Sequence, residues 1–200
     1  MEHFYESIEG WFTFQQLYQS MVNQATDNSL FIEVGTWKGR SAAFMAVEIL
    51  KSGKKIKFDC IDPFIAVEGV PGFDITHEEL KRSFIENMKP VEGHYTLYPE
   101  ASPAPATYYK DKSVDFIFID GSHTHEDVCA DIMGWMPKMK IGGVISGHDY
   151  DELSCGVRSA VNQIFGDKNW SDGNGCWVII VTEEIYNNIC NLNISTAENS

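Results

Sequence analysis

The residues best suited to chemistry in this chain follow short apolar runs. Glu33 lies within the run LFIEV, and a turn with two glycines, Gly35 and Gly39, comes directly after it. Glycine lets a backbone approach a ligand closely, and a helix that follows such a turn directs N–H groups that favour an anionic group such as a carboxylate. The turn lacks the G-x-G-x-x-G spacing of a dinucleotide fingerprint. Taken alone, it is equally compatible with a plain strand–helix connection.

Acids at the ends of three further runs favour a binding role for this turn. Asp62 ends KIKFDCID, 23 residues after Gly39, where a carboxylate can accept hydrogen bonds from both hydroxyls of a ribose. Asp120 ends SVDFIFID, and His148 with Asp149 lies near the end of GGVISGHDY. Because ligands of open parallel sheets bind beyond the carboxyl ends of the strands, these positions form the candidate site.

The elements that must hold these residues alternate along the chain. Short β-type runs alternate with segments of helical periodicity, which predicts right-handed crossovers and a mostly parallel sheet covered by helices on both faces. A capping box formed by Thr76 and Glu79 opens one of the helices. The expected strands are 30–34, 55–62, 94–98, 113–120, 142–150, and an antiparallel pair at 168–170 and 176–181; the expected helices are 11–22, 38–53, 76–88, 125–139 and 152–166.

The chain shows no internal repeat and no linker, so it predicts one domain over residues 1–200. Within it, residues 1–28 are expected to form a helical cap, 29–182 the α/β core, and 183–200 a polar tail whose last dozen residues are loose.

Charge and composition exclude several classes of partner. Fifteen basic residues against 29 acidic ones give a formal charge of −14, which disfavours nucleic acid and anionic membranes. No apolar stretch approaches the ~20 residues of a membrane span. The five cysteines are scattered without C-x-x-C spacing, and the start of the chain has no signal-peptide pattern, so free thiols in the cytoplasm are expected.

Three stretches resemble class I S-adenosylmethionine-dependent methyltransferases. FIEVGTWKGRSAAFMA resembles the first motif of that superfamily, E-x-G-x-x-x-G, and CIDPF resembles its second motif. VDFIFIDGSHTHEDVCADIMGWMPKMKIGGVISGHDY resembles a narrower group: small-molecule O-methyltransferases of the macrocin and catechol type, together with cephalosporin-hydroxylase-like proteins. The resemblance implies a Rossmann-like α/β/α sandwich whose mostly parallel, seven-stranded sheet ends in an antiparallel hairpin.

The resemblance also implies roles in binding S-adenosylmethionine. Glu33 and Gly35 would lie along the methionine part with Glu33 near the ammonium, Ser41 would hold the carboxylate, and Asp62 would bind the ribose. Ser102 falls where related enzymes contact the adenine. The full set of implied cofactor residues is Glu33, Gly35, Thr36, Gly39, Ser41, Asp62, Ser102 and Asp120.

A divalent metal is a second implication of the resemblance. The positions that match the metal ligands of related enzymes are Asp120, His148 and Asp149. Mg²⁺ would suit the two carboxylates and would lower the pKa of an acceptor hydroxyl. Related enzymes usually have an acid or asparagine at the position of His148. An imidazole there would shift the preference toward Mn²⁺, Fe²⁺ or Zn²⁺, or His148 is not a ligand and Asp120 acts only beside the cofactor.

His123 and His125 lie in GSHTHED, just after Asp120. A histidine is a natural general base for a hydroxyl. His123 is the better candidate because it lies closer to the strand end, whereas His125 more simply begins the next helix and faces solvent. Asp120 and His123 are therefore the predicted catalytic residues.

The leading hypothesis is methyl transfer from S-adenosylmethionine to a hydroxyl of a small molecule. The alternatives are an NAD-type oxidoreductase, which the missing fingerprint disfavours, and a non-catalytic cofactor-binding member of the fold, since a fold never proves an activity. The sequence leaves open the acceptor, the need for a metal, and whether the protein forms a homo-oligomer.

Overall fold

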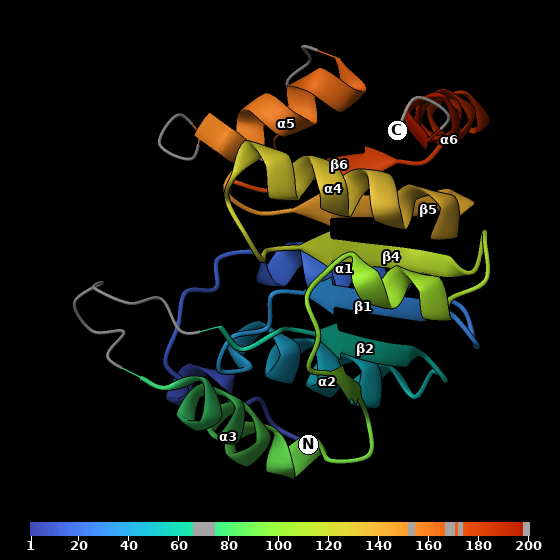
Figure 1. Ribbon diagram of the computed structural model, residues 1–200. Coiled ribbons are helices and arrows are strands. Elements are labelled where there is room, and N and C mark those ends of the chain that lie inside the picture. The colour runs from blue at the N-terminus through green and yellow to red at the C-terminus, as the bar shows by residue number, and fades with distance from the viewer. Residues whose placement is uncertain (66–74, 152–154, 167–170, 172–173, 198–200) are drawn as a thin grey trace. The chain divides into compact units, whose positions relative to one another are not determined.

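A computed structural model describes residues 1–65, 75–151, 155–166, 171 and 174–197 (Figure 1). It is a mixed α/β structure with a six-stranded sheet, mostly parallel with an antiparallel pair at the C-terminal end. The chain divides into two compact units, Met1–Ala101 and Ser102–Ser200. No helix of the described residues has both the length and the apolar content that a membrane span requires.

The first unit holds three parallel strands in the order β3-β2-β1. The pairing places Val34 opposite Ile61, so the carboxyl ends of β1 and β2 are level. The Gly35 N–H extends this ladder by donating to the Ile61 carbonyl over 2.9 Å. The residues that follow the two strands are therefore neighbours. The strands are β1 (Leu30–Val34), β2 (Lys57–Ile61) and β3 (Thr96–Tyr98).

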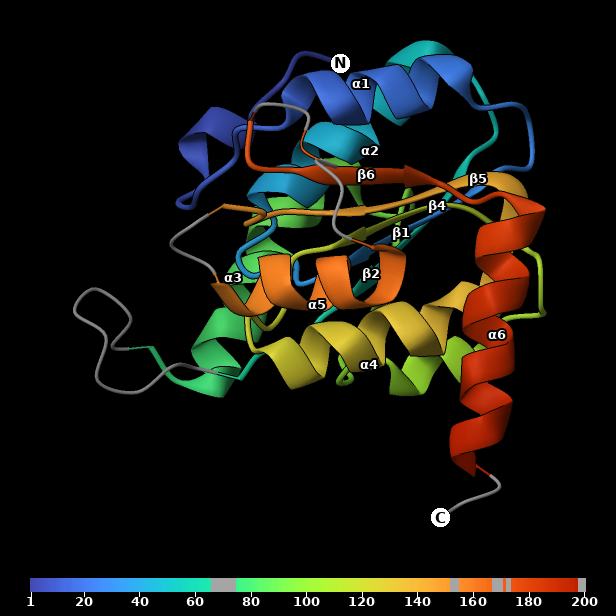
Figure 2. The ribbon, with the colours of Figure 1, turned by 90° about the horizontal axis from the view of Figure 1, so that it is seen from above.

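The helices of this unit confirm the predicted local signals. Gly53 ends α2 in the left-handed conformation, and Thr76 with Glu79 forms both bonds of the capping box at the start of α3. α1 and α2 lie side by side (Figure 2), since fully buried alanines on α2 allow close approach. The elements are η1 (Tyr5–Ser7), α1 (Gln15–Gln24), α2 (Arg40–Ser52), α3 (His77–Met88) and η2 (Lys89–Val91).

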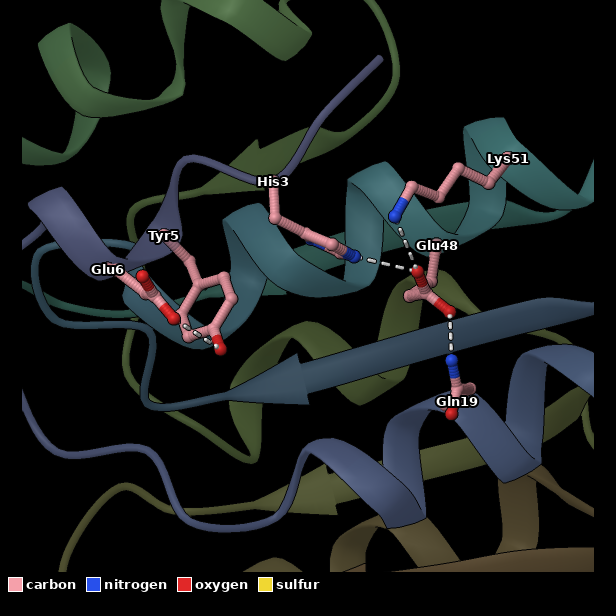
Figure 3. A network of polar contacts seen from close by, with 6 residues as sticks. All are labelled: His3, Tyr5, Glu6, Gln19, Glu48 and Lys51. Atoms are coloured by element: carbon pink, nitrogen blue, oxygen red, sulfur yellow. Dashed lines mark hydrogen bonds and ion pairs between the residues drawn. The ribbon is translucent and has the colours of Figure 1, made fainter.

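The segment before α1 is fixed on α2 by a polar network (Figure 3). His3 stacks on Phe44 with ring centroids 4.5 Å apart, and its Nε2 lies 2.8 Å from Glu48 Oε1. The second oxygen of Glu48 accepts a hydrogen bond from Gln19 over 3.1 Å, and Lys51 also pairs with Glu48. The helix predicted from residue 11 begins later, at Gln15, and residues 11–14 before it are not helical.

The second unit holds β4, β5 and β6 in that order. β4 and β5 are parallel, with Ile119 opposite Gly147, and β6 is antiparallel to β5, as predicted for the last strand. In Figure 2, α4 and α5 lie side by side on one face of these strands. The elements are η3 (Ala104–Tyr108), β4 (Val114–Ile119), α4 (His125–Trp135), η4 (Met136–Lys138), β5 (Met139–Gly147), α5 (Cys155–Phe165), β6 (Trp177–Ile180) and α6 (Glu183–Ala197).

The described residues form six strands, whereas seven were predicted; the predicted strand at 168–170 lies outside the described residues. The polar tail predicted from residue 183, with its last dozen residues loose, is instead the helix α6 as far as Ala197. The Thr182 hydroxyl caps this helix by accepting a hydrogen bond from the Ile185 N–H, and Ile189 is buried. A cap followed by two glutamates is the signal that the sequence reasoning overlooked.

Candidate functional site

The glycine turn between β1 and α2 has positive φ angles, which most residues rarely adopt. Gly35 and Gly39 have φ values of 84° and 89°, and Trp37 between them has a φ of 43°. A Cβ at Gly39 would lie 3.1 Å from atoms of both Phe84 and Met88 of α3. Gly39 is therefore required for close packing against α3 as well as for the turn, a second role that the sequence reasoning did not anticipate.

Asp62 holds this turn from the end of β2. Its Oδ2 accepts hydrogen bonds from the N–H groups of Thr36 and Trp37 over 2.8 and 2.7 Å, and its Oδ1 accepts one from Phe64 over 2.7 Å. Burial raises the pKa of Asp62, while these three N–H groups act to lower it. An ionised carboxylate has about four acceptor sites, so one remains for a ligand hydroxyl.

The other polar side chains of the turn lie close to one another and are buried. Ser41 donates a hydrogen bond from its hydroxyl to Glu33 Oε1 over 2.5 Å. The Thr36 hydroxyl is also buried, and it makes no hydrogen bond within the described part of the chain. The structure thus brings together the six predicted cofactor residues of the first unit. An acid, two hydroxyls and a helix start fit a ligand that carries both an ammonium and a carboxylate.

Ser102, the predicted adenine contact, is engaged within the second unit. Its hydroxyl oxygen accepts a hydrogen bond from the Trp135 indole N–H over 2.9 Å. The Ser102 hydroxyl also makes a hydrogen bond with the Asp131 carboxyl. Burial raises the pKa of Asp131 to about 6, although the hydrogen bond with Ser102 acts to lower it. Asp131 was missed by the sequence reasoning. The available signal was an acid three residues after Val128, on the apolar face of α4.

Three of the predicted residues meet where β4 and β5 end. The His148 N–H donates to the Ile119 carbonyl over 3.2 Å, which brings the loops after the two strands together. His123 Nε2 lies 3.0 Å from Asp149 Oδ2 and 3.9 Å from Asp120 Oδ1. One ligand atom from each of these three side chains lies within 4.8 Å of the others. We call Asp120, His123 and Asp149 the acid–histidine cluster.

Opposite charges hold this cluster. The neighbouring carboxylates of Asp120 and Asp149 raise the pKa of His123 to about 10, so the imidazole is a cation at neutral pH. The same contact with His123 holds the pKa of Asp149 well below its usual range. In this state His123 cannot act as a base, since it already carries the proton. A cation between two carboxylates occupies a position that suits a divalent metal.

His148 is placed beside the cluster rather than within it. Its Nδ1 lies 3.4 Å from Asp149 Oδ1. Burial acts to lower the pKa of His148, but the bond to Asp149 and nearby carboxylate charge leave it raised. The donor set that the structure groups is therefore Asp120, His123 and Asp149, which shares two members with the predicted set. Two hard carboxylates and one imidazole fit a divalent metal such as Mg²⁺ or Mn²⁺.

Comparison with solved structures shows that the chain shares its fold with several proteins that are methyltransferases by name. A protein from Corynebacterium glutamicum superposes with a TM-score of 0.61 at 14% identity, covering 88% of this chain and 84% of that chain. The O-methyltransferase NovP superposes with a TM-score of 0.58 at 16% identity, covering 86% of this chain and 80% of that chain. A SAM-dependent O-methyltransferase from Thermotoga maritima superposes with a TM-score of 0.55 at 13% identity, covering 78% of this chain and 51% of that chain.

Residues 32–150 match the profile of the family described as "Methyltransferase domain", and the chain belongs to that family. An uncharacterised protein of Acanthamoeba polyphaga mimivirus is 28% identical over 153 residues, which is 70% of this chain. The chain spans 61% of the length of that curated relative. The segment that matches the family, residues 32–150, includes the glycine turn and the acid–histidine cluster.

Proposed function

We propose that the protein transfers a methyl group from S-adenosylmethionine to a hydroxyl of a small molecule, with the help of a divalent cation. The observation that carries the proposal is the acid–histidine cluster, in a chain of the methyltransferase-domain family. A cofactor-binding protein without activity would have no need of two carboxylates drawn together at the ends of β4 and β5. NovP and the Thermotoga protein are O-methyltransferases by name, which agrees with a hydroxyl acceptor.

The glycine turn would bind the cofactor. The free acceptor site of Asp62 would take a ribose hydroxyl, and the Thr36 hydroxyl offers a buried group that a ligand can satisfy. Glu33 would attract the ammonium of the methionine part, and Ser41 would exchange its bond to Glu33 for one to the carboxylate. Each of these groups is buried, so its interaction with a charged ligand is strengthened by the low local dielectric.

Asp120 and Asp149 would hold the cation, and His123 would take the proton of the acceptor hydroxyl. When bound, a divalent cation would lower the pKa of the acceptor hydroxyl and fix its oxygen. His123 owes its raised pKa to the two carboxylates. Once their charge is neutralised, the pKa of His123 falls toward its ordinary range, where its Nε2 can accept the hydroxyl proton.

We also propose a small-molecule acceptor and a cytoplasmic location. A formal charge of −14 argues against a nucleic-acid acceptor, so we favour a small molecule. Cys60, Cys129, Cys176 and Cys190 are free thiols, which agrees with a reducing cytoplasm.

The proposal is tested by S-adenosylhomocysteine release from S-adenosylmethionine with a panel of hydroxylated acceptors. We expect release that depends on acceptor and on Mg²⁺ or Mn²⁺, and that is abolished by EDTA. The cluster variant Asp149→Asn should lose this release, whereas the matched control Asp111→Asn should keep it, since Asp111 is an exposed acid outside the cluster. Release unaffected by EDTA would remove the metal from the proposal. Binding of S-adenosylhomocysteine without turnover on any acceptor would favour a non-catalytic member of the family.

A further inference from the structure

A groove lies at the amino-terminal ends of β2 and β3, at the opposite end of β2 from Asp62. Its volume is about 370 Å³, within the range of small-molecule sites. The last turn of α2, the first residues of β2 and the segment from Gly93 to Thr96 line it. The groove belongs to the first unit alone and shares no lining residue with the glycine turn.

The charge of the groove is opposite to that of the whole chain. Lys54, Lys55, Lys57 and His94 line it, and no carboxylate belongs to its lining among the described residues. The run from Lys51 to Lys57 holds four of the fifteen basic residues of a chain whose formal charge is −14. A local excess of cations at a concave surface of an acidic protein favours an anionic ligand.

Internal roles account for only part of this charge. Lysines are common after helices because they interact with the last carbonyls. Lys54 has this role, since its Nζ donates to the carbonyls of Val22 and Asn23 at the end of α1. Lys51 pairs with Glu48, and Lys57 pairs with the buried Asp59 over 2.9 Å.

Lys55 and His94 have no such role. Both side chains are exposed, and neither makes a hydrogen bond or an ion pair with the described part of the chain. The Lys55 backbone is fixed, because its N–H donates to Asp27 and its carbonyl accepts from Asn28. These two cationic or titratable groups are therefore available to a ligand from a rigid backbone.

Part of the groove wall is apolar, and its rims are open. Ile56 and Phe58 are buried in the wall, and the Tyr95 ring packs edge-on against Phe84 with centroids 5.7 Å apart. Gly53 and Gly93, at the two rims, have no atom within 4 Å of the position of a Cβ. An anion that also carries a flat organic group would match both the cations and these walls.

We propose that this groove binds a small phosphorylated molecule, with Lys55 and His94 contacting the phosphate and the organic part lying against Tyr95. The proposal is independent of methyl transfer, because the groove lies away from the glycine turn and uses none of its residues. Charge-assisted hydrogen bonds to a phosphate make Lys55 the largest single contributor.

Titration with uridine 5′-monophosphate, followed by ¹H–¹⁵N NMR of the full chain, tests the proposal. A uridine nucleotide is chosen because it lacks the adenine of the methyl-transfer cofactor. We expect saturable shifts of the Gly53 and Gly93 amide signals, and weaker shifts with uridine. Lys55→Glu should weaken binding by about tenfold or more, because it replaces attraction with repulsion. Lys110→Glu, which makes the same charge change outside the groove, should weaken it by less than about twofold.

Three results would overturn the proposal. They are no saturable shift of the two glycines, equal affinity for uridine and its monophosphate, and equal weakening by Lys55→Glu and Lys110→Glu. Lys55→Gln provides a second variant that removes the charge without reversing it. Because Lys55 is exposed, both variants should keep the wild-type spectrum outside the groove, which verifies that they fold.

Discussion

The glycine turn of the first unit and the acid–histidine cluster of the second are held in different ways. Asp62 fixes the turn through the backbone N–H groups of Thr36 and Trp37, and the side chains of Glu33, Thr36 and Ser41 are buried. The cluster is held by charge between side chains, and His123 remains 56% exposed. The turn is therefore part of the fold, whereas the cluster can rearrange when a ligand changes its charge.

Because of this difference, mutations in the two regions should have different effects. Damage to the turn should reduce stability and cofactor affinity together, because the same hydrogen bonds serve both. Damage to the cluster should reduce turnover while the fold and the cofactor affinity remain, because half-exposed ion pairs add little stability.

Asp62→Asn should have the largest effect. The amide can no longer accept from all three backbone donors and presents N–H groups to at least one of them, at a cost of about 3–4 kcal/mol. Urea unfolding and calorimetric titration with S-adenosylhomocysteine measure the two consequences. Asp27→Asn is the control, because Asp27 also accepts a backbone N–H but is exposed. Equal effects of the two substitutions would contradict the role given to Asp62.

Asp149→Asn should abolish turnover with little effect on the fold. Asparagine tolerates the φ of 58° at this position, so only the charge is lost. We expect turnover to fall by about 100-fold or more, with unfolding free energy within about 1 kcal/mol of wild type. Steady-state kinetics and urea unfolding of the same preparation are the measurements. Full turnover in this variant would remove the cluster from the mechanism.

Asp131→Asn should reveal a pH-dependent cost inside α4. Burial raises the pKa of Asp131 to about 6 from its ordinary 3.8, so the folded state binds this proton more tightly than the unfolded state. The contribution of Asp131 to the free energy of unfolding of the wild type should therefore fall as pH rises from about 4 to about 6, and stay lower above that. The asparagine variant lacks this cost and should be more stable by about 2 kcal/mol at pH 8, with the difference shrinking toward pH 4. A difference that does not change with pH would contradict this assignment.

Ser41→Ala should have the smallest effect of the four. It removes the hydrogen bond to Glu33 from a buried pair, at a cost of about 1 kcal/mol in stability. The affinity for S-adenosylhomocysteine should fall several-fold, which titration of the variant beside wild type measures. An affinity loss without any stability loss would show that the Ser41–Glu33 bond is not part of the fold.

Local signals in the sequence predicted the turn well. The strand LFIEV, the glycines, the cap at Gly53 and the capping box at Thr76 all depend on residues close together in the chain. The sequence did not reveal that Gly39 also makes room for Phe84 and Met88, since that contact joins distant segments. The start of α1 was misplaced because Trp11 fits the helical period. In the structure Trp11 is 73% exposed and stacks on Trp37.

The cluster was predicted less completely. The sequence placed Asp120 and Asp149 at strand ends, and the parallel pairing of β4 with β5 brings them together. Which histidine joins them depends on the left-handed backbone of Asp149 and on side-chain directions in two loops. No periodic pattern encodes these features, and the structure places His123 within the cluster and His148 beside it.

Calorimetric titration of the wild-type protein with S-adenosylhomocysteine, with NAD as the control ligand, tests the central claim most directly. The account predicts micromolar binding of S-adenosylhomocysteine and no binding of NAD. It also predicts that Asp62→Asn loses this binding while Asp149→Asn keeps it. A folded sample that does not bind S-adenosylhomocysteine would contradict the claim that the glycine turn is a cofactor site.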